Sequence, residues 1–253
     1  MKGKSNEFST DSPVKIFVLG ENKWRDEKEF PLARTQYTKY YLHSSKGANS
    51  INGDGVISTT APKSEKPDQF EYDPANPVPT LGGRLCCGNE LAPGPTDQKA
   101  NESRNDVLVF STPPLTQDVE VTGFITAELY AATSAPDTDF TAMLVDVDES
   151  GYARYLADGI IRARYRNSTE KAEPIEAGKV YKYTIDLWAT SNVFKAGHRI
   201  RVYISSSNFP RFNRNLNTGE KTFGATRMNK AQQIIYHDSE HPSAIILPII
   251  PRR

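Results

Sequence analysis

The chain has 253 residues, enough for one large all-β domain or two small domains. Its 31 basic and 31 acidic side chains give a formal net charge of zero, which excludes the strongly basic surface of a typical nucleic-acid-binding protein. The longest apolar run, residues 244–250, is far too short to cross a membrane, so we expect neither nucleic acid nor a membrane as a partner. The first residues show no apolar signal-peptide segment, which favours the cytoplasm.

The first part of the chain alternates between strand-like and irregular segments. Residues 14–19 are almost all apolar and predict a strand buried on both faces, as in a parallel sheet. A second strand is predicted at residues 36–42. The small, polar residues 44–55 are the best candidate for a domain boundary. The proline- and glycine-rich residues 73–95 are expected to wrap across a sheet surface.

The two cysteines, Cys86 and Cys87, are adjacent in the sequence. Neighbouring cysteines rarely reach the geometry of a disulfide, and the chain has no third cysteine to pair with either of them. No C-x-x-C or paired-histidine spacing accompanies them, so we expect two ordinary thiols and no metal site.

Segments with alternating apolar and polar residues dominate the rest of the chain, and such alternation between turn residues predicts strands. Gly123 interrupts one of them at a point where a bulge or close packing is expected. Residues 230–237 fit either a short helix or a strand. The pattern predicts an all-β fold, an antiparallel jelly-roll β-sandwich from about residue 46 to the end. The predicted strands are residues 107–112, 119–133, 139–147, 153–166, 179–190 and 199–207.

Residues that suggest catalysis do not form a recognisable catalytic set. The nucleophile motif G-x-S-x-G is absent from the sequence, and the serines at 205–207 lie at a predicted strand end without flanking glycines. His198 is expected in a turn that enters a strand rather than in a catalytic triad. The zinc motif H-E-x-x-H is also absent. We therefore assign no catalytic residue and expect no cofactor.

Four aspartates between residues 137 and 148 are candidate calcium ligands, because sandwich domains bind Ca²⁺ at loop ends. The EF-hand pattern is not met, and alternation places Asp146 and Asp148 on the solvent face of a predicted strand. We expect these aspartates to be solvated or to cap turns.

Trp24, Trp188 and twelve tyrosines leave carbohydrate binding open, because exposed aromatic rings stack on sugars. Trp188 falls within a predicted strand, where packing in the core is the usual role of a tryptophan.

Residues 189–219 resemble the C-terminal domain of the CocE/NonD serine hydrolases. This family includes cocaine esterases, X-Pro dipeptidyl-peptidases, α-amino-acid ester hydrolases and glutaryl-cephalosporin acylases. The resemblance extends over nearly the whole chain, because several further segments match the family in the right order. These segments are residues 14–42, 72–83, 106–123, 137–147 and 240–250.

The resemblance implies an architecture in which an α/β-hydrolase domain with a helical cap precedes a C-terminal jelly roll of the galactose-binding-domain-like kind. Residues 1–45 would be the tail of the α/β-hydrolase domain, with its last strand and the connection leaving it, and residues 46–253 the jelly roll. The family's Ser-Asp-His triad lies upstream of that strand, so no catalytic residue is carried over. We predict that this chain is inactive alone, and the residues after Met1 look like chain interior.

The implied function is that of a non-catalytic β-sandwich domain in a hydrolase of esters or amides, of the esterase, acylase or dipeptidyl-peptidase type. It would pack on the α/β-hydrolase domain and shape the entrance for a small ester or amide substrate. The alternative is an autonomous carbohydrate- or peptide-binding module. The first hypothesis predicts an exposed apolar surface or a homo-oligomer of the isolated chain.

The loop after the last of these predicted strands is the candidate interface or substrate-entrance site. Its asparagines suit turns, its phenylalanines can anchor on apolar surface, and its arginines are expected to pair with carboxylates of a neighbouring domain. The candidate residues are Asn208, Phe209, Arg211, Phe212 and Arg214.

Overall fold

The computed structural model describes residues 12–85, 92–220 and 224–251, which are mainly β-structure. Cys86 and Cys87 lie outside the described residues, so the expectation of ordinary thiols stays a prediction. In chain order the strands are β1 (Val14–Val18), β2 (Lys23–Glu27), β3 (Gln36–His43), β4 (Val56–Ser58), β5 (Asp68–Tyr72), β6 (Leu108–Ser111), β7 (Val119–Thr133), β8 (Asp139–Val147), β9 (Ala153–Arg162), β10 (Tyr181–Phe194), β11 (Arg199–Ser205), β12 (Ala231–Tyr236) and β13 (Ala244–Ile250).

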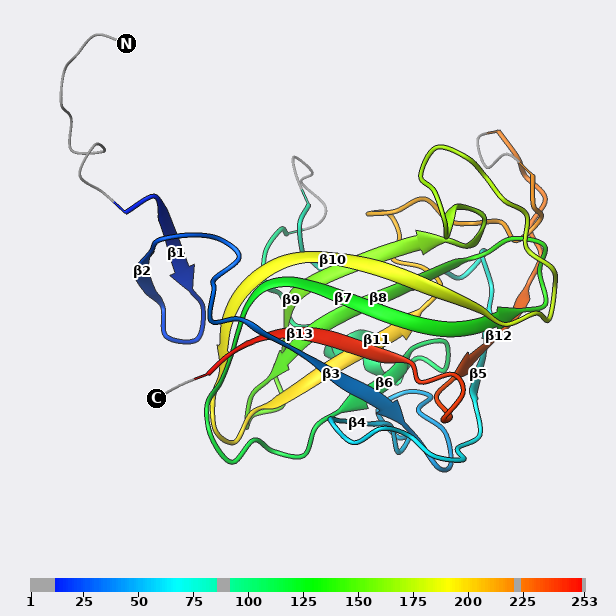
Figure 1. The fold of residues 1–253 in the computed structure, drawn as a ribbon. Helices are drawn as coiled ribbons and strands as arrows, with labels where there is room; N and C mark the ends of the chain where they lie inside the picture. The colour runs from blue at the N-terminus through cyan, green and yellow to red at the C-terminus, as the bar shows by residue number, and fades with distance from the viewer. Residues whose placement is uncertain (1–11, 86–91, 221–223, 252–253) are drawn as a thin grey trace, which may run out of the picture.

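One sheet of eleven strands curls into two layers around a common core (Figure 1). Strands β10, β7, β13 and β3 form one layer, and β9, β8, β11 and β6 form the other. Strand β4 joins the layers, because it pairs with β3 on one side and meets β6 in a single parallel pair on the other. The other pairings are antiparallel, which confirms the predicted all-β sandwich.

Alternation along the strands builds the core. In β7, the side chains of Val121, Ile125 and Leu129 are fully buried, whereas Phe124 points outward and is 39% exposed. Gly123 has a φ of 142°, and a Cβ added there would come within 2.9 Å of the Pro248 Cβ, so the predicted close packing at this glycine is confirmed. A register shift in β13 lies opposite this point.

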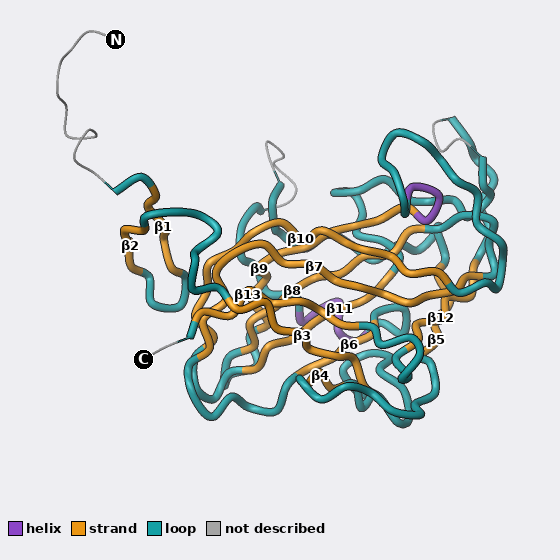
Figure 2. Tube along the Cα trace, viewed as in Figure 1, coloured by secondary structure: helices purple, strands orange, loops and turns teal. Residues whose placement is uncertain are grey.

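Among the described residues, helix is limited to two short turns, η2 (Lys99–Ser103) and η3 (Ala163–Tyr165), and loops make up much of the remainder (Figure 2). Residues 230–237, which fitted either a helix or a strand, contain β12. Among the described residues, none of the helices is long and apolar enough to pass through a bilayer.

The N-terminal strand differs from its prediction. Strand β1 pairs antiparallel with β2 in a separate hairpin at one end of the sandwich (Figure 1), so the expected parallel-sheet strand is wrong in this structure. The physical reason is the alternation of β1, whose last residue Val18 is buried while Lys15 and Phe17 face outward.

Strand β3 lies within the segment 1–45 that the sequence assigned to a preceding domain. In the structure β3 is hydrogen-bonded to β13 and β4, so it is part of the eleven-stranded sheet. The assignment of the residues before β3 to the end of another domain stays a prediction.

Candidate functional site

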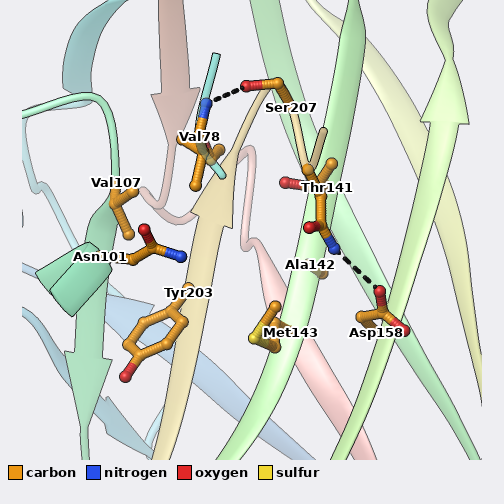
Figure 3. Close-up of a pocket in the computed structure, with 11 residues that line it drawn as sticks. Val78, Asn101, Val107, Thr141, Ala142, Met143, Asp158, Tyr203 and Ser207 are labelled. Atoms are coloured by element: carbon orange, nitrogen blue, oxygen red, sulfur yellow. Dashed lines mark hydrogen bonds between the residues drawn. The ribbon is translucent and has the colours of Figure 1, made fainter. Parts of the chain in front are cut away.

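The loop that follows β11 lies beside a small cavity, which Ser207 and Asn208 help to line. The cavity has a volume of about 20 Å³, enough for about one water molecule and too small for a substrate or cofactor. Figure 3 shows the Ser207 Oγ accepting a hydrogen bond from the Val78 N–H at 2.9 Å. Asp158, also labelled in Figure 3, accepts a hydrogen bond from Asn208 of the loop. The loop is therefore held down at its first residues.

Asp158 of β9 is the centre of the first polar network under the loop, and it is 2% exposed. Its Oδ2 lies 2.8 Å from the Arg211 Nε and accepts a hydrogen bond from the Asn208 Nδ2 at 3.0 Å. Its Oδ1 accepts from the Tyr155 hydroxyl at 2.5 Å and lies 3.3 Å from the Arg84 Nη2. Burial and the adjacent Asp158 charge raise the pKa of Tyr155 far above its usual range, so the hydroxyl stays a donor.

Asn215 is the centre of the second network. Its Nδ2 donates to the Asp137 Oδ2 and to the Asp139 Oδ1, each at 2.8 Å. Arg164 donates its Nε to Asp137 at 2.8 Å, and Arg162 binds both oxygens of Asp139 at 2.8 and 3.0 Å. One loop asparagine thus ties two buried carboxylates and their arginines to the loop.

The two loop arginines use their charges inside the domain. The prediction that Arg211 pairs with a carboxylate of another domain is wrong in this structure, because its partner is Asp158. Arg214 donates to the Pro74 carbonyl at 2.9 Å, and its guanidinium lies 5.0 Å from the centre of the Phe209 ring.

The outer part of the loop is more open. Phe209 is 38% exposed and follows the buried Asn208, whereas Phe212 is half-buried with the Arg211 guanidinium 4.9 Å from its ring centre. The structure brings the five predicted residues together on one well-anchored loop. Their role at an interface or a substrate entrance stays a prediction.

The expectation that the aspartates are solvated is wrong for three of the four. Asp146 is 5% exposed; its Oδ1 lies 2.8 Å from the His198 Nδ1, and its Oδ2 accepts from the Asn192 Nδ2 at 3.3 Å. Asp137 and Asp139 are buried among arginines, as described above. Strand β8 is covered on both faces, so alternation did not place Asp146 in solvent. Asp148 caps a turn as predicted, accepting from the Ser150 and Tyr152 N–H groups.

The three buried carboxylates are each engaged by an arginine or histidine side chain of the domain. Within residues 12–85, 92–220 and 224–251, no three or more histidine, cysteine, aspartate or glutamate side chains are grouped so as to hold a metal ion. The charges of Asp137 and Asp139 are balanced by Arg164 and Arg162.

Two of the three serines at the end of β11, Ser205 and Ser207, have hydrogen-bond partners within the domain. The Ser205 Oγ donates to the Asp106 carbonyl at 2.7 Å, and the Ser207 Oγ accepts from Val78. His198 lies in the turn that enters β11 and is paired with Asp146. These contacts agree with the prediction that His198 occupies a turn.

A Ser-His-Asp group that sequence reasoning missed lies elsewhere, and its geometry does not fit a proton relay. The His237 Nε2 lies 3.4 Å from the Ser44 Oγ and 3.1 Å from the Asp68 Oδ2, while its Nδ1 lies 3.2 Å from the Glu65 Oε2. Serine and aspartate therefore meet the same ring nitrogen, whereas a catalytic triad places them on opposite nitrogens. His237 is also fully buried, which keeps substrate away. No sequence spacing links these residues, so only the fold could reveal them.

Trp188 corrects a further expectation, because it does not pack in the core. A β-bulge between β10 and β7 interrupts the register beside Asp186, and Trp188 takes a φ of 69° with 59% of its surface exposed. Trp24 on β2 is 71% exposed. Both tryptophans face solvent, and the bulge that turns Trp188 outward has no clear signature in the alternating sequence.

Residues 6–246 match the family described as the X-Pro dipeptidyl-peptidase C-terminal non-catalytic domain. The match covers most of the chain. The chain belongs to this family. Together with the relatives below, this match confirms the resemblance to CocE/NonD hydrolases that the sequence motifs indicated.

Three relatives show how this C-terminal domain fits into longer proteins. Cocaine esterase of Rhodococcus sp. (strain MB1 Bresler) is 46% identical, and the match covers 100% of this chain and 44% of that protein. An aminopeptidase from the marine sediment archaeon Thaumarchaeota archaeon has a TM-score of 0.85 and 30% identity, over 95% of this chain and 41% of its own. An α-amino acid ester hydrolase has a TM-score of 0.82 and 29% identity, over 94% and 41% of the two chains. The chain thus spans less than half the length of these relatives.

Proposed function

We propose that this C-terminal domain serves in a serine hydrolase of esters or amides, where it packs against an α/β-hydrolase domain and helps to shape the substrate entrance. The observation that carries the proposal is the match to a non-catalytic C-terminal domain within relatives that are more than twice as long. One of those relatives is named a cocaine esterase and another an α-amino acid ester hydrolase.

The loop after β11 supports a role in shaping an entrance. Asn208 and Arg211 fasten it to Asp158, and Asn215 fastens it to a second buried carboxylate pair. A loop held at both ends presents Phe209 in a fixed position, which is the preorganisation that a binding entrance requires. In the proposed mechanism this domain positions the substrate, and the serine, histidine and oxyanion donors of acyl transfer belong to the other domain.

A chimera tests the proposal directly. The region of the Rhodococcus cocaine esterase that matches this chain is replaced by residues 1–253, and both the chimera and the isolated chain are assayed with p-nitrophenyl acetate. We expect serine-dependent hydrolysis by the chimera, inhibited by phenylmethylsulfonyl fluoride, and no turnover above background by the isolated chain. Serine-dependent turnover by the isolated chain, or an inactive chimera beside an active Rhodococcus enzyme, would contradict the proposal.

A second candidate function is an autonomous carbohydrate- or peptide-binding module. The exposed rings of Trp24 and Trp188 favour it, because a sugar stacks on an exposed aromatic face. Titration of the isolated chain with galactose, followed by tryptophan fluorescence, separates the two functions. A saturable change that Trp188→Ala abolishes would favour the binding module.

A further inference from the structure

We propose that an aromatic cluster on the outer face of the β10–β7 layer, formed by Phe30, Phe124 and Trp188, is the surface that the catalytic domain of the parent hydrolase covers. This inference rests on the proposed function and names the contact surface for it. The expected partner surface is apolar, because the cluster offers rings rather than charges.

The cluster is continuous across separate parts of the chain. The ring centres of Phe30 and Phe124 are 5.4 Å apart at 64°, and those of Phe124 and Trp188 are 6.2 Å apart at 89°. The three side chains are 38%, 39% and 59% exposed. Edge-to-face contacts of this kind are favourable, yet much of each ring remains available to a partner.

Exposed aromatic side chains are numerous on the strands of this layer and on the hairpin. Ten large apolar side chains are exposed among the described residues, and six are aromatic residues of β1, β2, β3, β7, β10 and the connection between β2 and β3. Concentrated exposure of this kind marks an interaction surface, whereas isolated exposed apolar residues are ordinary. The six are Phe17, Trp24, Phe30, Tyr37, Phe124 and Trp188.

The backbone at Trp188 is strained in a way that keeps the ring outside. A φ of 69° is uncommon for a bulky residue, and such conformations concentrate at functional positions. The bulge is also held from two sides. The Asp186 Oδ1 accepts from the Trp188 N–H at 2.7 Å, and the Arg84 Nη2 donates to the Leu187 carbonyl at 3.2 Å. Because Arg84 also binds Asp158, the bulge is tied to the network beneath the loop.

The hairpin lies at one end of the sandwich (Figure 1) and carries a second exposed aromatic pair. Phe17 and Trp24 lie opposite each other in its register, with ring centres 5.4 Å apart, and are 39% and 71% exposed. Leu19 bonds the edge of β10 through Ser191 and Val193. A two-stranded hairpin alone is marginally stable, so a partner covering its outer aromatic pair would stabilise it.

The position of the hairpin indicates which partner covers this face. The family is a C-terminal domain, and more than half of each relative lies outside the matched region, so in those relatives a preceding domain leads into the segment that corresponds to β1. The hairpin containing β1 borders this face, since Arg25 of β2 binds Glu120 of β7, four residues before Phe124. A catalytic domain that precedes β1 would therefore join the chain beside this face, and we infer that it is the partner that covers the cluster.

The charges beside the cluster agree with an apolar contact. Arg25 pairs with Glu120 at 2.6 Å, and Glu128 further along β7 pairs with Lys39 and Lys182 at 2.7 and 2.6 Å. Because each of these charged groups has an ion-pair partner within the domain, the surface offers little electrostatic selection and suits a permanent contact between domains of one chain.

Hydroxyl-radical footprinting of the chimera described above, compared with the isolated chain, tests the inference. We expect at least a fivefold fall in the labelling of Phe124 and Trp188 in the chimera. Met228, which is 39% exposed and far from the cluster in sequence, is the control and should label equally in both. Trp188→Ala combined with Phe124→Ala should lower the inactivation temperature of the chimera by several degrees, whereas Ile51→Ala should not.

The outcomes separate this inference from the proposed function. A chimera that hydrolyses p-nitrophenyl acetate but labels Phe124 and Trp188 as strongly as the isolated chain overturns the inference and leaves the proposed function standing. Protection that rises with protein concentration in the isolated chain, with a dimer in light scattering, assigns the cluster to a second copy and also overturns it. An inactive chimera overturns the proposed function itself.

Discussion

The loop after β11 and the aromatic cluster use their side chains in opposite ways. The loop contains four asparagines and two arginines, and most of these groups are bonded to partners within the domain, as Asn208 and Arg211 are to Asp158. The aromatic cluster contains Phe30, Phe124 and Trp188, which pack on one another but leave 38–59% of their surfaces open. Most polar side chains of the loop are therefore satisfied within the domain, whereas the aromatic rings of the cluster are only partly covered.

The difference shows that residue type alone is a poor guide to which side chains are free to bind another molecule. Buried polar groups must find hydrogen bonds, so a polar loop lying over a core is expected to be bound to that core. Apolar side chains have no such requirement, and an exposed cluster of them is the feature that still lacks a partner. A search for function in this domain is thus better directed at its exposed aromatic residues.

Asp158→Ala gives the largest expected effect and tests whether the loop is held from within. Removing the carboxylate leaves Arg211 and Asn208 without their buried partner, which costs about 3–5 kcal/mol in the free energy of unfolding. Urea denaturation of the isolated chain measures it. Glu149→Ala, at an exposed carboxylate, is the control and should change the free energy by less than about 0.5 kcal/mol.

Asn215→Ala tests whether the buried asparagines of the loop stabilise the domain more than its exposed asparagines do. It removes two hydrogen bonds to the buried Asp137 and Asp139, so the free energy of unfolding should fall by roughly 1–3 kcal/mol in denaturant titrations. The neighbouring Asn213 is exposed and accepts one bond from Arg162, and Asn213→Ala should be nearly neutral. Equal effects of the two substitutions would show that burial does not distinguish the loop asparagines.

His237 is a buried ionisable residue outside the loop, and its contribution to stability can be measured through its pH dependence. Burial by itself lowers the pKa of His237, but the hydrogen bonds and charges of Asp68 and Glu65 outweigh it and raise the pKa above its usual value of about 6.5. The stability contributed by the protonated ring is fully present below about pH 6.5 and is lost as the pH rises through the folded-state pKa.

The melting temperature of His237→Gln, relative to the wild type, measures this contribution. The difference should be larger at pH 6 than at pH 9, because only the charged ring is favoured by the two carboxylates. His241→Gln, at a partly exposed histidine, is the matched control. A difference independent of pH would show that the ring contributes by packing alone.

Trp188→Ala gives the smallest expected change in the free energy of unfolding of the isolated chain. It tests the aromatic cluster rather than the polar loop. The ring is 59% exposed, so the free energy of unfolding should change by less than about 1 kcal/mol. Trp188→Gly should be at least as stable as the alanine variant, because glycine takes a φ of 69° without strain. A loss of several kcal/mol would mean that the cluster supports the fold and is not held ready for a partner.

Much of the fold was predictable from local patterns. Alternation located the long strands, including β7, β8, β10 and β11, and the turn residues between them indicated an antiparallel sandwich. Gly123 was recognised as a point of close packing. The hairpin was not, because an apolar run such as residues 14–18 fits a parallel or an antiparallel pairing equally well until its neighbour is known.

The candidate site was predictable only in part. The five loop residues were found from composition, but the partner of Arg211 was misassigned, since Asp158 lies 53 positions earlier in the chain. Asp146 was placed in solvent and Trp188 in the core, and both are reversed. In each case the error concerns which face another segment covers.

The sequence by itself determined the all-β class, the order and approximate bounds of the strands, and membership of the non-catalytic C-terminal domain family. These properties follow from period-two alternation, turn residues and ordered motifs, all of which are patterns of residues close together in the sequence. The tertiary structure alone decided which charges are satisfied and which rings are exposed. Those properties depend on contacts between distant residues, such as Asn215 and Asp137, 78 positions apart, and no local pattern encodes them.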